Sequence, residues 1–347
     1  MRPSIIKPFL NFCLLITIAT ITLGDSQSFA QISDPRDLPG NTLWLDGSDV
    51  DGDFVSGGAF LNGTTWVDKS TAQNASAIQT VASALPTVVN TSVNNLTAVQ
   101  FDGDDFMDVA STAFGMLRNV EGATMIGVLR TERESSNQAL RALMVSSGAN
   151  SAATRAGINM FDGFGNNIGG TGDFGLAGRR LDSDGFQRIE GGNIVAGQVH
   201  TLTGLFDYQA GGISLLVDGQ QETSIGTFQS PGLTSDTDSL NIRVGADAAL
   251  NMPRGFFDGQ ISELIVYDRV LSASELADLD AYITEKWTPV ADPMLGDVNL
   301  DGSVNFFDIA PFIAVLSAGP FQAEADIDQN GEVNFFDIAP FIDLLSG

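Results

Sequence analysis

The residues best suited to chemistry lie near the C-terminus, in two twelve-residue segments with oxygen-bearing side chains at matching positions. The first segment begins at Asp297, and the second begins 29 residues later at Asp326. Each has Asp or Asn at positions 1, 3, 5 and 12 and Gly at position 6. Calcium prefers six to eight oxygen ligands, and glycine permits the sharp turn that folds the chain around the ion. The spacing therefore predicts two calcium loops of the EF-hand type.

We expect two calcium ions, each held by side chains at positions 1, 3, 5 and 12 and by the backbone carbonyl at position 7. The expected ligands are Asp297, Asn299, Asp301, Ser303 and Asp308 in the first loop, and Asp326, Asp328, Asn330, Glu332 and Asp337 in the second. Position 12 is Asp in both loops, where a bidentate Glu is usual. The alternative is a pair of polar turns without metal, but the matched spacing of the two segments favours calcium.

Positions 10 and 11 of both loops are phenylalanine, within segments Val304–Ile313 and Val333–Ile342 that are identical. The four side chains are those of Phe306, Phe307, Phe335 and Phe336. They either pack into a small core or stay exposed as an apolar docking patch. The sequence leaves both readings open, and the second makes these residues the candidate partner-binding surface.

A helix is expected after each loop, with Asn305 and Asn334 suited to cap its first turn. Pro311 and Pro340 fall inside these expected helices. Proline in a regular helix interior costs about 3 kcal/mol because it removes an amide and clashes with the preceding turn. We therefore expect each proline to kink or shorten its helix.

Composition excludes several classes of function. The chain has 347 residues, with 16 basic and 43 acidic side chains and a net charge of −27. Nucleic acids and anionic membrane surfaces attract basic proteins, so neither is an expected partner. One Cys and one His exclude a Cys/His zinc site and a disulfide framework.

The N-terminus has the features of an export signal. Arg2 and Lys7 precede a mostly apolar stretch, and Ser28 and Ala30 supply small residues for cleavage after residue 30. We expect residues 1–30 to be removed, which leaves no membrane-inserted segment and places the protein outside the cell or on its surface. The alternative is an N-terminal anchor helix, but the apolar stretch is short and interrupted by threonines.

The pattern of the central part of the chain predicts many short strands separated by Gly, Asn, Asp and Ser clusters. Such a pattern is typical of an antiparallel sandwich or barrel. The expected strands include Thr42–Leu45, Ala98–Phe101, Thr124–Leu129, Leu143–Val145, Val199–Phe206, Ile213–Val217, Leu240–Val244 and Ile261–Tyr267. Asp218 and Gly219 form a type I′ hairpin signal. The acidic clusters 49–53 and 102–105 lack a ligand at a twelfth position, and we expect surface turns there.

One amphipathic helix is expected at the end of this region. Ser272 and Glu275 form a capping box, in which each side chain satisfies a free backbone amide. Leu276, Leu279 and Ile283 recur on one face, and the pattern ends near Trp287. We expect the helix to pack its apolar stripe onto the sandwich.

The order of several motifs resembles the concanavalin A-like, laminin G-like jelly-roll family. They are Leu43–Asp46, Trp66–Ser70, Gln100–Gly103, Val217–Gly219, Asp258–Ser272 and Tyr282–Trp287. The resemblance implies that residues 31–290 form two packed antiparallel sheets, in a family whose members bind glycans, bind proteins or hydrolyse polysaccharides. Residues 291–347 resemble paired dockerin type I repeats, which implies calcium-dependent docking onto a cohesin-like or other surface protein.

Catalysis is not the expected function. The glucanases of this fold alternate two Glu and an Asp along one strand, and the sequence has no such run. Our leading hypothesis is therefore an exported non-catalytic protein that recognises a carbohydrate or surface protein through its mainly β sandwich. The alternatives are a polysaccharide-degrading component and a structural cell-surface protein.

Overall fold

A computed structural model describes residues 32–91, 93–133, 136, 139–147, 154–160, 173–247, 254–288 and 293–346. The expected export signal and its cleavage site lie outside these residues. No helix within the described ranges is long and apolar enough to cross a membrane.

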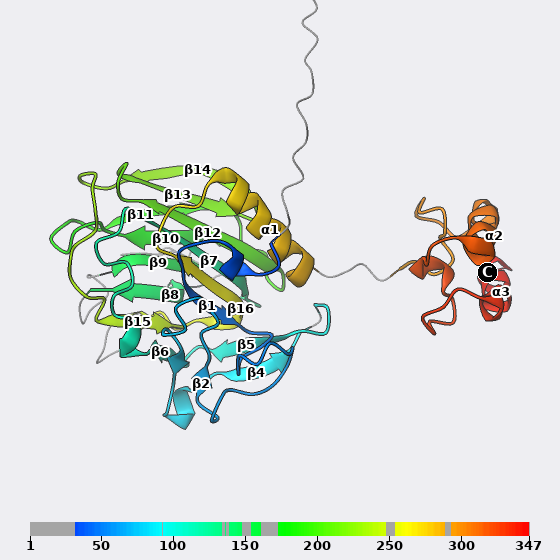
Figure 1. Ribbon diagram of the computed structural model, residues 1–347, viewed down its shortest axis with the longest axis horizontal. Coiled ribbons are helices and arrows are strands. Elements are labelled where there is room, and N and C mark those ends of the chain that lie inside the picture. The colour runs from blue at the N-terminus through cyan, green and yellow to red at the C-terminus, as the bar shows by residue number, and fades with distance from the viewer. Residues whose placement is uncertain are drawn as a thin grey trace, which may run out of the picture.

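The central region contains two eight-stranded sheets whose strand pairs are antiparallel (Figure 1). The first sheet has the order β14 (Gln220–Thr227), β13 (Gly212–Val217), β12 (Val199–Asp207), β7 (Gly122–Arg130), β16 (Asp258–Tyr267), β5 (Thr97–Asp102) and β4 (Thr87–Asn90), and β1 (Asn41–Asp46) pairs with β16. The second has the order β11 (Gln187–Gly191), β10 (Phe174–Gly178), β9 (Thr154–Met160), β8 (Leu140–Ser146), β15 (Asn241–Val244), β6 (Met107–Val109), β3 (Ala77–Ile78) and β2 (Thr65–Trp66). The predicted mainly β jelly-roll sandwich is confirmed.

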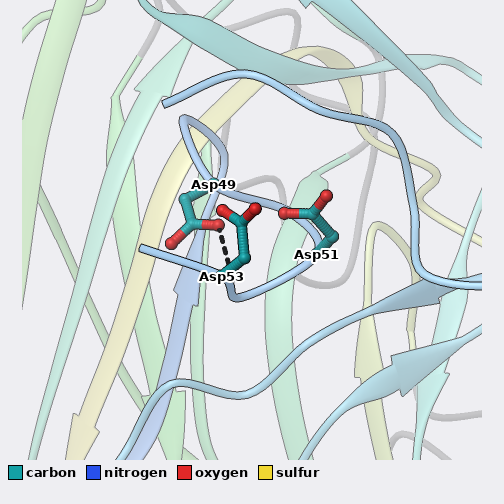
Figure 2. Close-up of side chains that lie close together, drawn as sticks. All are labelled: Asp49, Asp51 and Asp53. Carbon is teal, nitrogen blue, oxygen red and sulfur yellow. Dashed lines mark hydrogen bonds between the residues drawn. The ribbon is translucent and has the colours of Figure 1, made fainter. Parts of the chain in front are cut away.

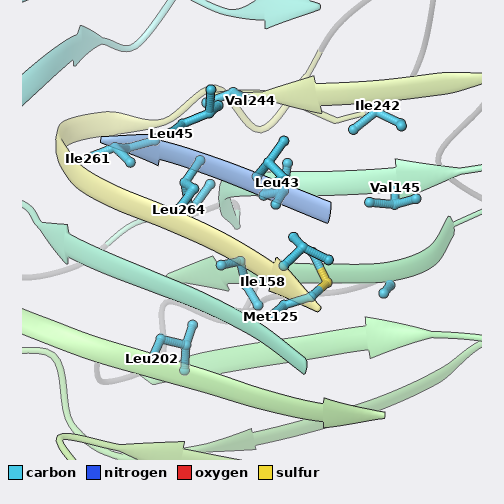
Figure 3. Packing of buried hydrophobic residues seen from close by; sticks show 14 of the residues in the cluster. Leu43, Leu45, Met125, Val145, Ile158, Leu202, Ile242, Val244, Ile261 and Leu264 are labelled. Atoms are coloured by element: carbon cyan, nitrogen blue, oxygen red, sulfur yellow. The ribbon is translucent and has the colours of Figure 1, made fainter. Parts of the chain in front are cut away.

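The core lies between the two sheets and follows the alternation of side chains along each strand. In β7, Met125 and Leu129 belong to this core, whereas Ile126 and Val128 lie on the opposite face. Figure 3 shows the same inward set from both sheets, including Val145 and Ile158 of the second sheet. The expected strands are all present, although the strand expected at Leu240 begins at Asn241.

The outer face of the first sheet is covered in part by α1 (Ala273–Trp287) (Figure 1). The predicted capping box is present, because Ser272 accepts from the Glu275 amide and Glu275 accepts from the Ser272 amide. Leu279 and Ile283 pack against Ile126 and its neighbours on the sheet. This packing confirms the expected apolar stripe. The hairpin is confirmed too, since Asp218 and Gly219 have φ of 49° and 73° between β13 and β14.

The C-terminal module contains α2 (Ile309–Ala318) and α3 (Ile338–Ser346), each preceded by a 3-10 turn. Its buried apolar core is small and consists of Val298, Phe312, Ala325, Ile327 and Phe341. Phe312 and Phe341 occupy equivalent positions in the two repeats, and their rings stack with centroids 4.1 Å apart. Each repeat therefore supplies one ring of the central contact.

Candidate functional site

The first loop wraps its backbone amides around two buried carboxylates. Asp297 accepts hydrogen bonds from the amides of Asp301 and Gly302, at 3.0 and 2.9 Å. Asp308 accepts from the amides of Asn299 and Asn305, at 2.9 and 2.8 Å. Positions 1 and 12 of the loop thus face the same interior, as a calcium loop requires.

The second loop repeats this arrangement. Asp326 accepts from the amides of Asn330 and Gly331, and Asp337 accepts from those of Asp328 and Asn334. One carboxylate oxygen each from Asp326, Asp328 and Asp337 lies within 4.8 Å of the others. Three of the five expected ligands are thus brought together as a cluster of hard oxygen donors, the chemistry that calcium prefers.

The remaining expected ligands lie on the open side of each loop. Asp301, Ser303, Asn330 and Glu332 are exposed, and Asn299 is half-buried. The glycines at position 6, Gly302 and Gly331, have φ of 85° and 88°. A side chain at such a φ is strained, so the turn that folds each loop depends on glycine.

The prolines lie in the first turns of the helices that follow the loops, where the kink expected for an interior proline has no physical cause. Pro311 and Pro340 are the third residues of α2 and α3. Amides in the first turn of a helix have no partner within it, so a proline there removes no helical hydrogen bond. Asn305 and Asn334 cap the preceding 3-10 turns, in agreement with their predicted capping role.

The phenylalanine pairs are exposed and do not belong to the module core. Phe306 and Phe307 are 79% and 77% exposed, and Phe335 and Phe336 are 71% and 65% exposed. They directly precede the closing aspartates, Asp308 and Asp337, so any ion in the loop orders the same turn that presents the rings. Of the two readings that the sequence left open, core packing is wrong.

The acidic cluster at 49–53 differs from the expected surface turn, because Asp49 is buried. Asp49 accepts from the amides of Gly52, Asp53 and Phe54, and it forms an ion pair with Lys69 at 2.6 Å. Figure 2 shows the Asp49, Asp51 and Asp53 side chains close together. The lysine already supplies a positive charge at this cluster.

The cluster at 102–105 also contains a buried carboxylate. Burial, together with the neighbouring Asp102, raises the pKa of Asp105 to about 6. Asp105 accepts from the Asp102 amide at 3.2 Å, which holds the turn after β5.

Sequence reasoning missed a buried polar cluster beneath α1. Glu263 of β16 is completely buried and accepts from the indole nitrogens of Trp44 and Trp287, at 2.6 and 2.5 Å, and from the Tyr282 hydroxyl at 2.8 Å. Burial raises the pKa of Glu263. The signal was present in the motifs that carry the family resemblance, which contain all of these residues.

Two lysines complete this cluster. Lys286 forms ion pairs with Asp46 at 2.8 Å and with Glu263 at 3.4 Å, and Lys69 lies 2.9 Å from Asp46. Burial alone would raise the pKa of Asp46, but Lys286 and Lys69 outweigh it and lower the pKa to about 2. The buried carboxylates are thus occupied by partners within the protein and hold α1 against the sheet.

His200, like the buried carboxylates, is bonded to partners within the protein. Its Nδ1 lies 2.8 Å from Asp218 Oδ2, and its Nε2 accepts from the Val195 amide. Both ring nitrogens are therefore engaged within the fold. The ring also packs against Phe174, with centroids 5.1 Å apart.

The described part of the chain thus consists of a two-sheet antiparallel sandwich followed by a module with two acidic loops. Comparison with protein families gives the same division. Residues 131–277 match the concanavalin A-like lectin/glucanases superfamily, and residues 295–346 match the dockerin type I domain. The chain therefore contains a concanavalin A-like domain followed by a dockerin type I domain, as the motifs predicted. Neither match names a catalytic domain.

Dockerin type I domains bind calcium and cohesins and occur in secreted or cell-surface proteins. Calcium is therefore the cofactor of this class of module. No curated protein matches the chain.

Several solved structures resemble part of the chain at low identity. A Ruminococcus gnavus IT-sialidase CBM40 bound to α2,3-sialyllactose is 17% identical, with a TM-score of 0.41, and the match covers 53% of this chain and 95% of that one. Domain 4 of a GH43 extracellular arabinanase from Geobacillus stearothermophilus, in complex with arabinotriose, is 13% identical, with a TM-score of 0.42 and coverage of 69% and 98%. A Trypanosoma rangeli sialidase is 12% identical, with a TM-score of 0.47 and coverage of 73% and 34%.

Proposed function

We propose that the chain is an exported binding protein with two working parts. Residues 31–290 recognise a carbohydrate or a surface protein, and residues 291–347 attach the protein to a cohesin-like partner when two calcium ions occupy the loops. The ligands of these ions are the ten loop residues named above.

The observation that carries this proposal is the exposure of the four phenylalanines beside the acidic loops. Exposed aromatic pairs cost solvation free energy unless a partner covers them, and large exposed apolar patches mark interaction sites. Because each pair immediately precedes the aspartate at position 12, calcium binding would order the docking surface and the loop together.

Charge adds a condition on the partner. No Lys or Arg follows Lys286 in the sequence, so the module has only acidic charges. Its partner should therefore present apolar pockets rimmed by basic side chains, because complementary charge speeds association and excludes wrong partners.

The test is surface plasmon resonance with the immobilised chain and a panel of purified cohesin domains, in calcium and in chelator. We expect calcium-dependent binding that is lost when Phe306, Phe307, Phe335 and Phe336 are all replaced by serine. Phe321→Ser is the matched control, since Phe321 is 59% exposed in the same module but lies outside the loops. Binding that survives the fourfold change, or that ignores calcium, would contradict the proposal.

A further inference from the structure

Within the part of the sandwich that the structure describes, exposed aromatic side chains are scarce. Among its described residues, Phe54 is the one aromatic side chain with large exposure, at 54%. Arg36 and Lys69 lie over its ring, at 4.6 and 4.8 Å from the centroid. A concave site with polar side chains is the alternative place for a sugar among the described residues.

One such site lies where the C-terminal end of α1 meets the outer face of the first sheet. It is a pocket of about 320 Å³, near the lower end of the range of about 300–1,000 Å³ for small-ligand sites. The side chains that define its chemistry are those of Arg130, Gln198, Gln260, Ser262, Trp287 and Thr288. Ser262 and Trp287 are buried, so the groups that can bind sugar oxygens are the Arg130 guanidinium, the amides of the two glutamines and the Thr288 hydroxyl.

The charge of the pocket is unusual for this chain. The whole sequence has 43 acidic and only 16 basic side chains. Among the described residues that line the pocket, none is acidic and Arg130 is the one basic residue. The charge on the lining of the pocket is that of Arg130, which a ligand carrying negative charge complements.

Arg130 is held in a fixed orientation. Its Nε donates to the Gly197 carbonyl at 2.8 Å, and its Nη1 donates to Gln260 Oε1 at 3.4 Å. Its Nη2 forms an ion pair with Glu132, whose side chain is 71% exposed, whereas that of Arg130 is 28% exposed. The guanidinium is therefore pre-oriented inside the pocket, and its carboxylate partner lies at the solvent edge, where a ligand anion can displace it.

We propose that this pocket binds an anionic sugar residue of a polysaccharide, with Arg130 pairing with the sugar's carboxylate or sulfate and the two glutamines binding its hydroxyls. The inference rests on the proposed carbohydrate recognition by residues 31–290 and specifies the ligand class. Glu132 then acts as an internal competitor for Arg130 and weakens binding of the anion.

The test is isothermal titration calorimetry of the full chain in calcium with polygalacturonate, dextran sulfate and neutral dextran. We expect saturable binding to at least one of the two anionic polymers and none to dextran, and the arm that binds identifies carboxylate or sulfate as the group recognised. Arg130→Gln should weaken binding about tenfold or more, since it removes a charge-assisted hydrogen bond. Glu132→Gln should strengthen it about threefold, as expected for release from an exposed ion pair.

Matched controls separate the pocket from overall charge and from folding. Asp236→Asn removes a negative charge from the exposed Arg118 ion pair elsewhere on the sandwich and should leave binding unchanged. Glu132→Gln alters an exposed side chain and keeps the test informative if Arg130→Gln lowers the melting temperature. The inference is overturned if both anionic polymers fail to bind, if dextran binds equally well, or if neither pocket variant changes the affinity. Equal binding of dextran would leave the proposed carbohydrate recognition standing, and only the anionic ligand class would fail.

Discussion

The sandwich and the C-terminal module are stabilised by different means. The sandwich buries side chains from two eight-stranded sheets and adds a second apolar cluster beneath α1. The module buries five apolar residues and surrounds them with acidic loops. A small core supplies little free energy of folding, so modules of this size depend on metal or cross-links. From this difference we expect the sandwich to be stable without metal and the module to need calcium for its stability.

Calcium removal is the strongest way to test this contrast. If free calcium is about 100 times the dissociation constant, each site adds about 2.7 kcal/mol and two sites add about 5 kcal/mol. We expect chelation to lower or abolish the module's transition in differential scanning calorimetry and to leave the sandwich transition in place. A module transition that does not respond to chelator would show that the loops are turns without metal.

Lys286→Met tests how far buried ion pairs stabilise the sandwich. The substitution removes the ion pairs to Asp46 and Glu263. It leaves buried carboxylates with less compensation, which should lower the free energy of unfolding of the sandwich by about 3 kcal/mol. Urea denaturation measures the change, and the module should be unaffected.

Arg118→Met is the control for that experiment. Arg118 pairs with Asp236 in an exposed position, so its loss should lower the free energy of unfolding much less than Lys286→Met does. Equal effects of the two substitutions would mean that the buried cluster does not hold α1.

Acid should weaken the sandwich through the same cluster. Lys286 and Lys69 outweigh burial and lower the pKa of Asp46 to about 2, and the hydrogen bond from Arg269 lowers the pKa of Glu275 to about 2. A depressed carboxyl pKa gives stability that is present above the unfolded pKa and is lost as the pH falls toward the folded value. We therefore expect the sandwich melting temperature to fall between about pH 4.5 and pH 2.

The raised pKa of Glu263 does not obscure this window. Its stabilising effect is fully present below the unfolded pKa and is lost only at higher pH. Asp46 contributes about 2 kcal/mol to the acid dependence, and Glu275→Gln should reduce the slope. A melting temperature that stays constant down to pH 2 would contradict the assigned ion pairs.

Gly302→Ala should have a small effect on the first calcium loop. A residue with a side chain at φ of 85° costs about 1–2 kcal/mol. We expect a modest loss of calcium affinity in the first loop, measured by titration calorimetry, with the second loop unchanged. Gly212→Ala serves as a control, since nothing lies near its added carbon and its φ is not positive.

The sequence predicted features that depend on nearby residues. Strands, the Asp218 hairpin, the capping box at Ser272 and the two acidic loops all follow from periodicity or from fixed spacing within about twelve residues. Local patterns could not predict the cluster beneath α1, because Trp44 and Glu263 are 219 positions apart and meet only after the sheet has formed. The motifs of the family resemblance contain its residues but do not say that they meet.

The prolines and the phenylalanines show a second limit. The effect of Pro311 depends on where the helix begins, and the 3-10 turn moves that start to Ile309. Whether Phe306 is buried depends on the space left by Phe312 and Phe341, which already fill the small core. The first outcome depends on the exact start of a helix and the second on packing across repeats, and periodicity encodes neither.

The stacked rings of Phe312 and Phe341 limit how the number of repeats can change during evolution. Each repeat contributes one ring to a shared contact, so a repeat that is duplicated or deleted singly leaves one ring facing water. Recombination that changes the number of repeats should therefore be tolerated in steps of two. We therefore expect the pair of repeats, and not a single loop with its helix, to be the smallest unit of this module that can be transferred to another protein.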